Sequence, residues 1–133
     1  MILSLQALVT YMAGFVMQKA VDKGIKATLI SRGVEGDGYT TFIALDNTKI
    51  AKQAAEFMAQ KMDEKGVVLM LQGVEGATTT AQRRQGFEEV LANYPQMSII
   101  YKRGNFLRND TMKVMEELYN EGVHFDAIYS HSD

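Results

Sequence analysis

The chain has 133 residues, a length typical of one domain, and 14 Lys and Arg stand against 16 Asp and Glu, a formal net charge of −2. Surfaces that bind nucleic acids usually carry a basic excess, so this balance argues against a nucleic-acid partner. The absence of cysteine excludes disulfides, thiol nucleophiles and cysteine-ligated metals. Neither His124 nor His131 has a matching second ligand nearby. We therefore expect neither a metal site nor a cofactor.

The first 16 residues are apolar enough to suggest a signal or membrane segment. They lack a basic start and a clear cleavage site, Gln6 and Thr10 interrupt them, and they are too short to span a bilayer. No signal peptide is visible. The apolar residues recur at helical spacing, which predicts a core-facing helix. This stripe consists of Leu5, Leu8, Val9, Met12 and Val16.

Hydrophobic periodicity predicts a series of helices and strands along the chain. The expected helices cover residues 5–23, 47–64, 79–93 and 107–120, and the expected strands cover 26–31, 41–45, 67–71, 97–101 and 125–130. The run 67–71 is almost purely aliphatic, as in a strand buried on both faces. The expected inward faces of the last three helices are Ile50, Ala54, Phe57 and Met58, then Phe87, Val90, Leu91 and Tyr94, then Met112, Met115, Leu118 and Tyr119.

Glycine separates a helical pattern from an apolar run at Lys23-Gly24-Ile25, Lys65-Gly66-Val67 and Glu121-Gly122-Val123. A glycine just past a helix is a typical stop signal, because it adopts a left-handed backbone conformation without a Cβ clash. Repeated joints of this kind indicate an α/β fold. We expect a Rossmann-like parallel sheet with flanking helices.

The last expected strand, 125–130, has no helix after it to cover it. We interpret this as an incomplete piece of a larger protein, or as a chain whose cover comes from partner chains. The alternative is a small complete sheet protein with a frayed end. Uncovered sheet edges favour association, so we also expect a homo-oligomer.

Polar and aromatic residues follow the expected strands. If the strands share one parallel sheet, these residues converge on one edge. Guanidinium, carboxylate, carboxamide and aromatic groups together suit a neutral polyhydroxy ligand, because each sugar hydroxyl both donates and accepts and a sugar ring packs on an aromatic face. The candidate ligand-binding residues are Arg32, Asp46, Asn47, Arg83, Phe106, Ser132 and Asp133.

Several candidates have simpler structural interpretations. Asn47 is a natural helix N-cap, Asp46 could only orient the turn, Arg83 could face solvent, and Phe106 could pack against the next helix. Enzyme signatures are mostly absent: 33–36 and 73–76 repeat Gly-Val-Glu-Gly, but neither continues as a dinucleotide or P-loop motif, and a Glu in each would repel phosphate. We therefore expect no enzymatic activity.

Thr41-Phe42-Ile43-Ala44-Leu45-Asp46-Asn47 runs from an expected strand through Asp-Asn into an expected helix. This segment resembles the strand and Asp-Asn helix start in the second lobe of the periplasmic sugar-binding proteins of the ribose-binding type. Leu71-Gln72-Gly73 followed by Arg83-Arg84-Gln85-Gly86-Phe87 is similar to that family's Leu-Gln-Gly loop and Arg-x-x-Gly-Phe helix. Asn105-Phe106 and Ser130-His131-Ser132-Asp133 fall where the family continues, and the order of elements over 26–133 agrees with it.

The resemblance implies two Rossmann-like lobes that are joined by a hinge and close on a sugar. Residues 1–40 would then be the end of the first lobe and the hinge, and 41–133 the first part of the second. Arg32, Asn47, Arg83 and Phe106 match sugar-contacting positions, whereas Ser31 replaces an Asp and Ser132 replaces an Asn that the family often has.

By the same resemblance the parent protein is the periplasmic or extracytoplasmic solute-binding component of a sugar ABC importer, with a monosaccharide ligand and a membrane permease partner. Two alternatives remain: the sugar-sensing effector domain of a lactose-repressor-like regulator, and a nucleotide- or phosphate-handling α/β enzyme. Such regulators often carry Gly-His before the strand matched here by Val67–Leu71, where this chain has Glu64-Lys65-Gly66.

Overall fold

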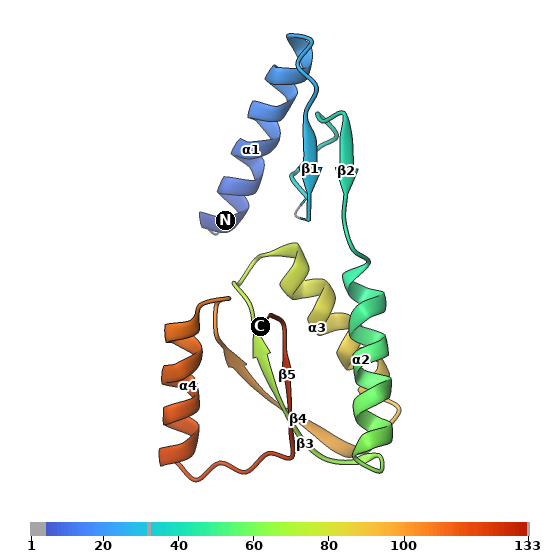
Figure 1. The fold of residues 1–133 in the computed structure, drawn as a ribbon, viewed down its shortest axis with the longest axis vertical. Coiled ribbons are helices and arrows are strands. Elements are labelled where there is room, and N and C mark those ends of the chain that lie inside the picture. The colour runs from blue at the N-terminus through green and yellow to red at the C-terminus, as the bar shows by residue number, and fades with distance from the viewer. Residues whose placement is uncertain (1–4, 32, 133) are drawn as a thin grey trace. The chain divides into compact units, whose positions relative to one another are not determined.

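A computed structural model describes residues 5–31 and 33–132, which form four helices and five strands in the expected order (Figure 1). The α/β class is therefore confirmed. In chain order the elements are α1 (Leu5–Asp22), β1 (Thr28–Ile30), β2 (Thr41–Ile43), α2 (Asn47–Lys61), β3 (Lys65–Gln72), α3 (Thr78–Leu91), β4 (Gln96–Arg103), α4 (Arg108–Asn120) and β5 (Ala127–Ser130).

The strands are divided between two parallel sheets, β1-β2 and β4-β3-β5, so the expectation of one common sheet edge is wrong. The chain correspondingly forms two compact units, one comprising residues 1–46 and 76–78 and the other 47–75 and 79–133. We expected β2 to open the second lobe at residue 41, but β2 pairs with β1 and the first unit continues to Asp46.

The N-terminal unit is a two-stranded sheet with one helix. Thr28 pairs with Thr41 and Ile30 with Ile43, and the Ser31 N–H continues the ladder to the Ile43 carbonyl at 2.8 Å. So narrow a sheet covers little of a helix. Met12 and Val16, expected in the core, are 50% and 58% exposed. The side chains of Leu5, Leu8 and Val9 lie outside the described part of the chain.

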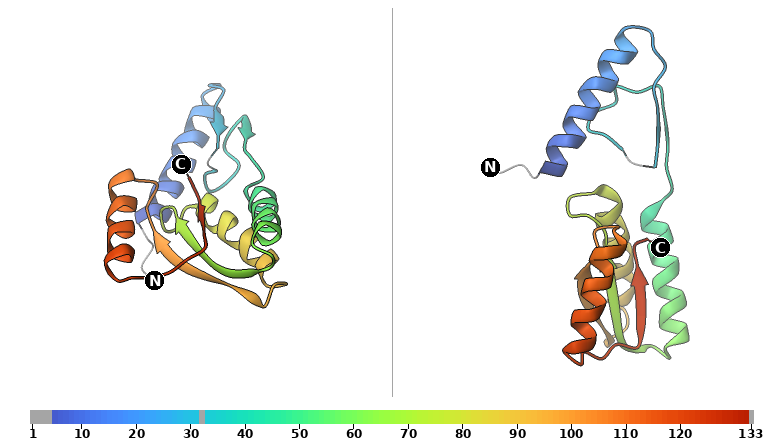
Figure 2. Two further views of the ribbon diagram at one scale, coloured as in Figure 1. Left: turned by 60° about the horizontal axis from the view of Figure 1, so that its bottom comes forward. Right: turned by 60° about the vertical axis from the view of Figure 1, so that its left-hand side comes forward.

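The C-terminal unit is built on a three-stranded sheet with β3 in the middle (Figures 1 and 2). Alternation along β3 sends Val68 and Met70 to the face covered by α2 and α3, and Leu69 and Leu71 to the face covered by α4. Val68, Leu69 and Met70 have no solvent exposure. This confirms that the aliphatic run is a strand buried on both faces.

Helix α2 turns a different face to the core from the one expected. Its buried stripe is Asn47, Ala51, Ala55 and Ala59, spaced four residues apart. The expected inward residues Ile50 and Phe57 are 40% and 61% exposed, whereas Ala54 and Met58 pack at the margin of the core. Small residues bring α2 close to α3: a Cβ on Gly86 would come within 2.4 Å of the Thr48 carbonyl oxygen. The prediction of the buried face from the large apolar side chains is therefore wrong.

The predicted inward face of α3 is confirmed, and that of α4 is confirmed in part. On α3, Phe87 and Leu91 are buried and Val90 packs against the same cluster, as expected. Tyr94, which follows the helix, packs there too. On α4, Leu118 is buried and Met115 packs beside it. In contrast, Met112 and Tyr119 are 51% and 86% exposed, so half of the stripe predicted for α4 is wrong.

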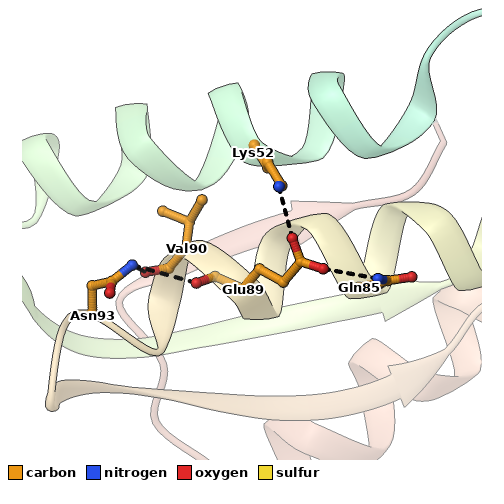
Figure 3. A network of polar contacts seen from close by, with 5 residues as sticks. All are labelled: Lys52, Gln85, Glu89, Val90 and Asn93. Atoms are coloured by element: carbon orange, nitrogen blue, oxygen red, sulfur yellow. Dashed lines mark hydrogen bonds and ion pairs between the residues drawn. The ribbon is translucent and has the colours of Figure 1, made fainter.

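A polar network on the outer surface joins α2 to α3 (Figure 3). Lys52 Nζ lies 2.7 Å from Glu89 Oε2, and Gln85 Nε2 donates to Glu89 Oε1 at 2.8 Å. One turn later Asn93 Nδ2 donates to the Val90 carbonyl at 3.1 Å. The Lys52 ammonium and the Gln85 amide lower the pKa of Glu89. Because the pair is exposed, it contributes little stability.

Two of the three predicted glycine stops are confirmed. Gly24 and Gly122 have φ of 77° and 65°, and the residue after each donates its N–H to a carbonyl of the last helical turn. At the end of α2 the left-handed residues are Asp63 and Glu64, with φ of 51° and 59°, and Gly66 lies inside β3.

Within the described residues no helix is long and apolar enough to cross a membrane.

Candidate functional site at the carboxyl end of the three-stranded sheet

The C-terminal unit contains Asn47, Arg83, Phe106 and Ser132 of the seven predicted site residues. Asp46 is exposed and ends the N-terminal unit. Arg32 and Asp133 lie outside the described residues. The four residues in the C-terminal unit come from the start of α2, the first half of α3, the loop after β4 and the segment after β5. The last three segments follow the carboxyl ends of the three parallel strands, and the start of α2 joins them through the Asn47–Arg83 hydrogen bond.

Arg83 and Asn47 are in direct contact. The Arg83 Nε–H donates to Asn47 Oδ1 at 2.9 Å, and Arg83 Nη1 donates to the main-chain carbonyl of His131. Asn47 is only 5% exposed, and its Nδ2 donates to Gln82 Oε1 at 3.4 Å. The start of α2, the second turn of α3 and the residue after β5 therefore meet at one guanidinium. Arg83 is not the free surface residue that we considered.

His131 is the buried residue of this cluster. Its side chain is 2% exposed, its ring packs edge-on against Tyr129 at 5.4 Å between centroids, and its Nδ1 accepts the Gly73 N–H at 3.4 Å. Burial, and secondarily the charge of Arg83, lowers the pKa of His131 to about 4. The imidazole is therefore neutral at pH 7, as an acceptor for Gly73 must be.

The loop after β4 holds Phe106 in an unusual backbone conformation. Asn105 and Phe106 have φ of 55° and 59°, which is rare for residues with a side chain. The loop is fixed at its base, because the N–H groups of Gly104 and Asn105 both donate to the Gln72 carbonyl, at 2.9 and 3.2 Å. The Asn105 side chain donates to Asp110 at 2.8 Å. Such backbone strain is often found at ligand sites.

Gly73 lies between the Arg83 cluster and Phe106. Its N–H donates to His131, and a Cβ built on it would come 1.9 Å from Phe106 Cζ. The Phe106 ring therefore packs on the Gly73 backbone, in space that any side chain would fill. Neither Gly73 nor His131 was among the predicted site residues. Both residues lie in segments that resemble the sugar-binding family, Gly73 in Leu71-Gln72-Gly73 and His131 in Ser130-His131-Ser132-Asp133, so that resemblance could have identified them.

A cavity of about 400 Å³ opens on the α4 side of the sheet end. Phe106, Ser130 and Ser132 line it together with residues of α4 and the end of β3, whereas Asn47 and Arg83 do not. Alternation along β5 explains this division: Tyr129 belongs to the core on the α2 and α3 side, so Ser130 points to the opposite face. The structure thus brings two pairs of predicted residues to the same sheet end, on its two faces. The remaining lining residues are Leu71, Gln72, Gly104, Leu107, Arg108, Thr111 and Met112.

The charges around this end are partly compensated. Arg103 pairs with Glu75, and on the flank of α3 Arg84 lies 2.7 Å from Glu88 and stacks over Tyr101 at 4.9 Å from the ring centroid. Among the described residues, none of the ion pairs includes Arg83, and no cluster of His, Asp and Glu could hold a metal ion. The chemistry available at this sheet end is hydrogen bonding by a charged donor on one face and packing against an aromatic ring on the other.

Residues 9–133 match the sequence profile of a periplasmic binding protein domain. The chain belongs to this family. The periplasmic binding protein domain is 31% identical over 110 residues to the ribose import binding protein of Bacillus subtilis (strain 168), and 29% identical over 126 residues to the galactofuranose-binding protein of Escherichia coli (strain K12). These matches cover 83% and 89% of this chain. The predicted family resemblance is confirmed.

Solved structures agree. The fold matches the periplasmic binding component of the arabinose ABC transporter from Shewanella sp. ANA-3, bound to α- and β-L-arabinofuranose, with a TM-score of 0.81 and 29% identity over 89% of this chain. That match covers 41% of the Shewanella chain, and the two curated matches cover 36% and 40% of those proteins. The periplasmic binding protein domain described here therefore spans well under half the length of these relatives.

Proposed function

We propose that this chain is part of the solute-binding component of a sugar ABC importer and contributes to the reversible, non-covalent capture of a monosaccharide. The observation that carries the proposal is the fixed guanidinium of Arg83 at the same sheet end as the ring of Phe106. The names of the relatives, which bind or import ribose, galactofuranose and arabinose, support a sugar as the ligand class.

The chemistry of the two residues suits a sugar. Arg83 uses two of its five N–H donors inside the protein, and the others can donate to sugar hydroxyl or ring oxygens. The half-buried Phe106 ring contacts Gly73 and also lines the cavity. An aromatic ring in a cavity wall suits the apolar C–H face of a pyranose or furanose. In this proposal Ser132 adds a hydroxyl on the cavity side, and the site holds its ligand without transforming it.

Under this proposal the protein acts outside the cytoplasmic membrane, and its partner is the membrane permease of the importer. Asp46, Arg32 and Asp133 remain proposed ligand contacts of the whole protein. The role and location are proposed from the names of the relatives. The ligand chemistry is proposed from the residues at the end of the three-stranded sheet.

Isothermal titration of the 133-residue chain with D-ribose, L-arabinose and D-galactose tests the proposal, with glycerol as a control for nonspecific heat. We expect saturable heat with at least one sugar, lost in Arg83→Ala and retained in Lys113→Ala, which changes an exposed residue of α4. Absence of saturable heat with all three sugars would contradict sugar capture by this chain.

A further inference from the structure

We propose that Asn47 is a positioning residue: its side-chain oxygen, together with the main-chain carbonyl of His131, fixes the orientation of the Arg83 guanidinium, and Asn47 does not itself contact the ligand. The sequence had placed Asn47 among the ligand contacts. This inference rests on the proposed function for the identity of the site, but the orientation of Arg83 can be tested without any ligand.

The first support is the geometry at Arg83. A free arginine side chain has many rotamers, and holding it in one of them loses conformational entropy. Here two acceptors from different elements bind two of its nitrogens: Asn47 Oδ1 at the start of α2 accepts from Nε at 2.9 Å, and the His131 carbonyl after β5 accepts from Nη1. A planar guanidinium bound at two of its nitrogens has one orientation, so its remaining N–H groups point in fixed directions.

The second support is burial. Asn47 is 5% exposed, and its Oδ1 and Nδ2 already bond to Arg83 and Gln82. A ligand approaching from solvent meets Arg83, which is half-buried, before it meets Asn47. Asn47 also begins α2, so its backbone position is fixed by the helix. These features suit a residue that acts through another residue.

The third support is charge. Both acceptors of Arg83 are neutral oxygens, and within residues 5–31 and 33–132 no ion pair involves Arg83. A carboxylate in place of Asn47 would hold the guanidinium equally well but would offset its charge. A neutral amide holds Arg83 and leaves its positive charge for an oxygen of the ligand.

The test follows the ¹H–¹⁵N signal of Arg83 Nε–H in the ¹⁵N-labelled 133-residue chain, identified by its loss in Arg83→Lys. We expect its exchange with water to be at least tenfold slower than that of Arg108, an exposed arginine. Asn47→Ala should raise the Arg83 rate to that of Arg108. Asn47→Asp keeps the accepting oxygen and should keep the protection. Gln82→Ala, the matched control, removes the other partner of Asn47 and should change nothing. Unchanged protection in Asn47→Ala, with the amide spectrum of the fold retained, would overturn the proposal.

A second arm uses D-ribose and L-arabinose in titrations of the same variants. Positioning through the oxygen alone predicts that Asn47→Ala weakens binding at least tenfold and that Asn47→Asp weakens it much less. Equal losses in the two variants, with Arg83 protection intact in both, would assign Asn47 a direct ligand contact and overturn the proposal. If neither sugar binds the wild-type chain, the proposed function fails on that result, and the exchange rates alone decide whether Asn47 orients Arg83.

Discussion

The ring of Phe106 occupies the space where a side chain of Gly73 would be: a Cβ on Gly73 would come 1.9 Å from Phe106 Cζ and 2.2 Å from Cε1. The loop after β3 and the loop after β4 therefore pack against each other at Gly73. The same Gly73 donates its N–H to His131, so the two faces of the sheet end meet there.

Replacing Gly73 by alanine should displace the Phe106 ring. Overpacking of this kind typically costs about 1–3 kcal/mol of unfolding free energy, which urea denaturation measures. Phe106→Ala removes the opposing atoms, so the double variant Gly73→Ala with Phe106→Ala should show a smaller loss than the sum of the two single losses. Additive losses would mean that the clash is relieved elsewhere and that the ring does not depend on Gly73.

Replacing Gly86 by alanine should also destabilise the fold, in this case because the added Cβ would clash with the backbone of α2. A Cβ there would lie 2.4 Å from the Thr48 carbonyl oxygen of α2, and a helix backbone moves less readily than a side chain. We expect Gly86→Ala to lower the unfolding free energy by about 2 kcal/mol or more, against the usual benefit of alanine in a helix. Gln85→Ala, on the exposed side of the same helix, should change it by only about 0.5 kcal/mol. Similar effects for the two variants would contradict the close approach of α2 and α3.

The buried face of α2 can be tested by a pair of substitutions with opposite expectations. Ala55 has no exposure, so Ala55→Leu should strain the core and lower the unfolding free energy by about 1–3 kcal/mol. Phe57 is 61% exposed, so Phe57→Ala should lower it by only about 0.5–1 kcal/mol. Thermal or urea unfolding distinguishes this face from the one that the large apolar residues predicted. A larger loss for Phe57→Ala than for Ala55→Leu would instead support the face predicted from the large apolar residues.

His131 should make stability depend on pH. Burial first, and then the charge of Arg83, lowers its folded pKa to about 4 from an ordinary value of 6.5. The unfolded chain therefore binds a proton at higher pH than the folded chain does. The stability that His131 contributes is complete above about pH 6.5 and is lost as the pH falls towards 4, by up to roughly 3 kcal/mol in total.

Urea midpoints between pH 7 and pH 4 measure this loss. We expect His131→Gln to reduce the pH dependence, because a glutamine side chain takes up no proton in this range. The groups that contact the His131 ring and carbonyl are the Gly73 N–H, the Tyr129 ring and Arg83. Equal pH dependence in wild type and His131→Gln would assign the effect to other groups.

The sequence by itself determined the order of helices and strands, because hydrophobic period and glycine position are local properties of the chain. Hence the strand 67–71, the inward face of Phe87 and Leu91, and the stops at Gly24 and Gly122 were predicted correctly. The motifs around Leu71-Gln72-Gly73 and Arg83 likewise sufficed to indicate the family.

Only the tertiary structure decided which surfaces meet. Five parallel strands were consistent with one sheet, but hydrogen bonding divides them into two, since register and neighbours depend on partners distant in sequence. The alanine stripe of α2 is buried because Gly86 allows a close helix contact, which no local pattern in α2 reveals. For the same reason the sequence could place Asn47 and Arg83 at one end of a sheet, but only the fold brings the Asn47 oxygen and the His131 carbonyl to the same guanidinium.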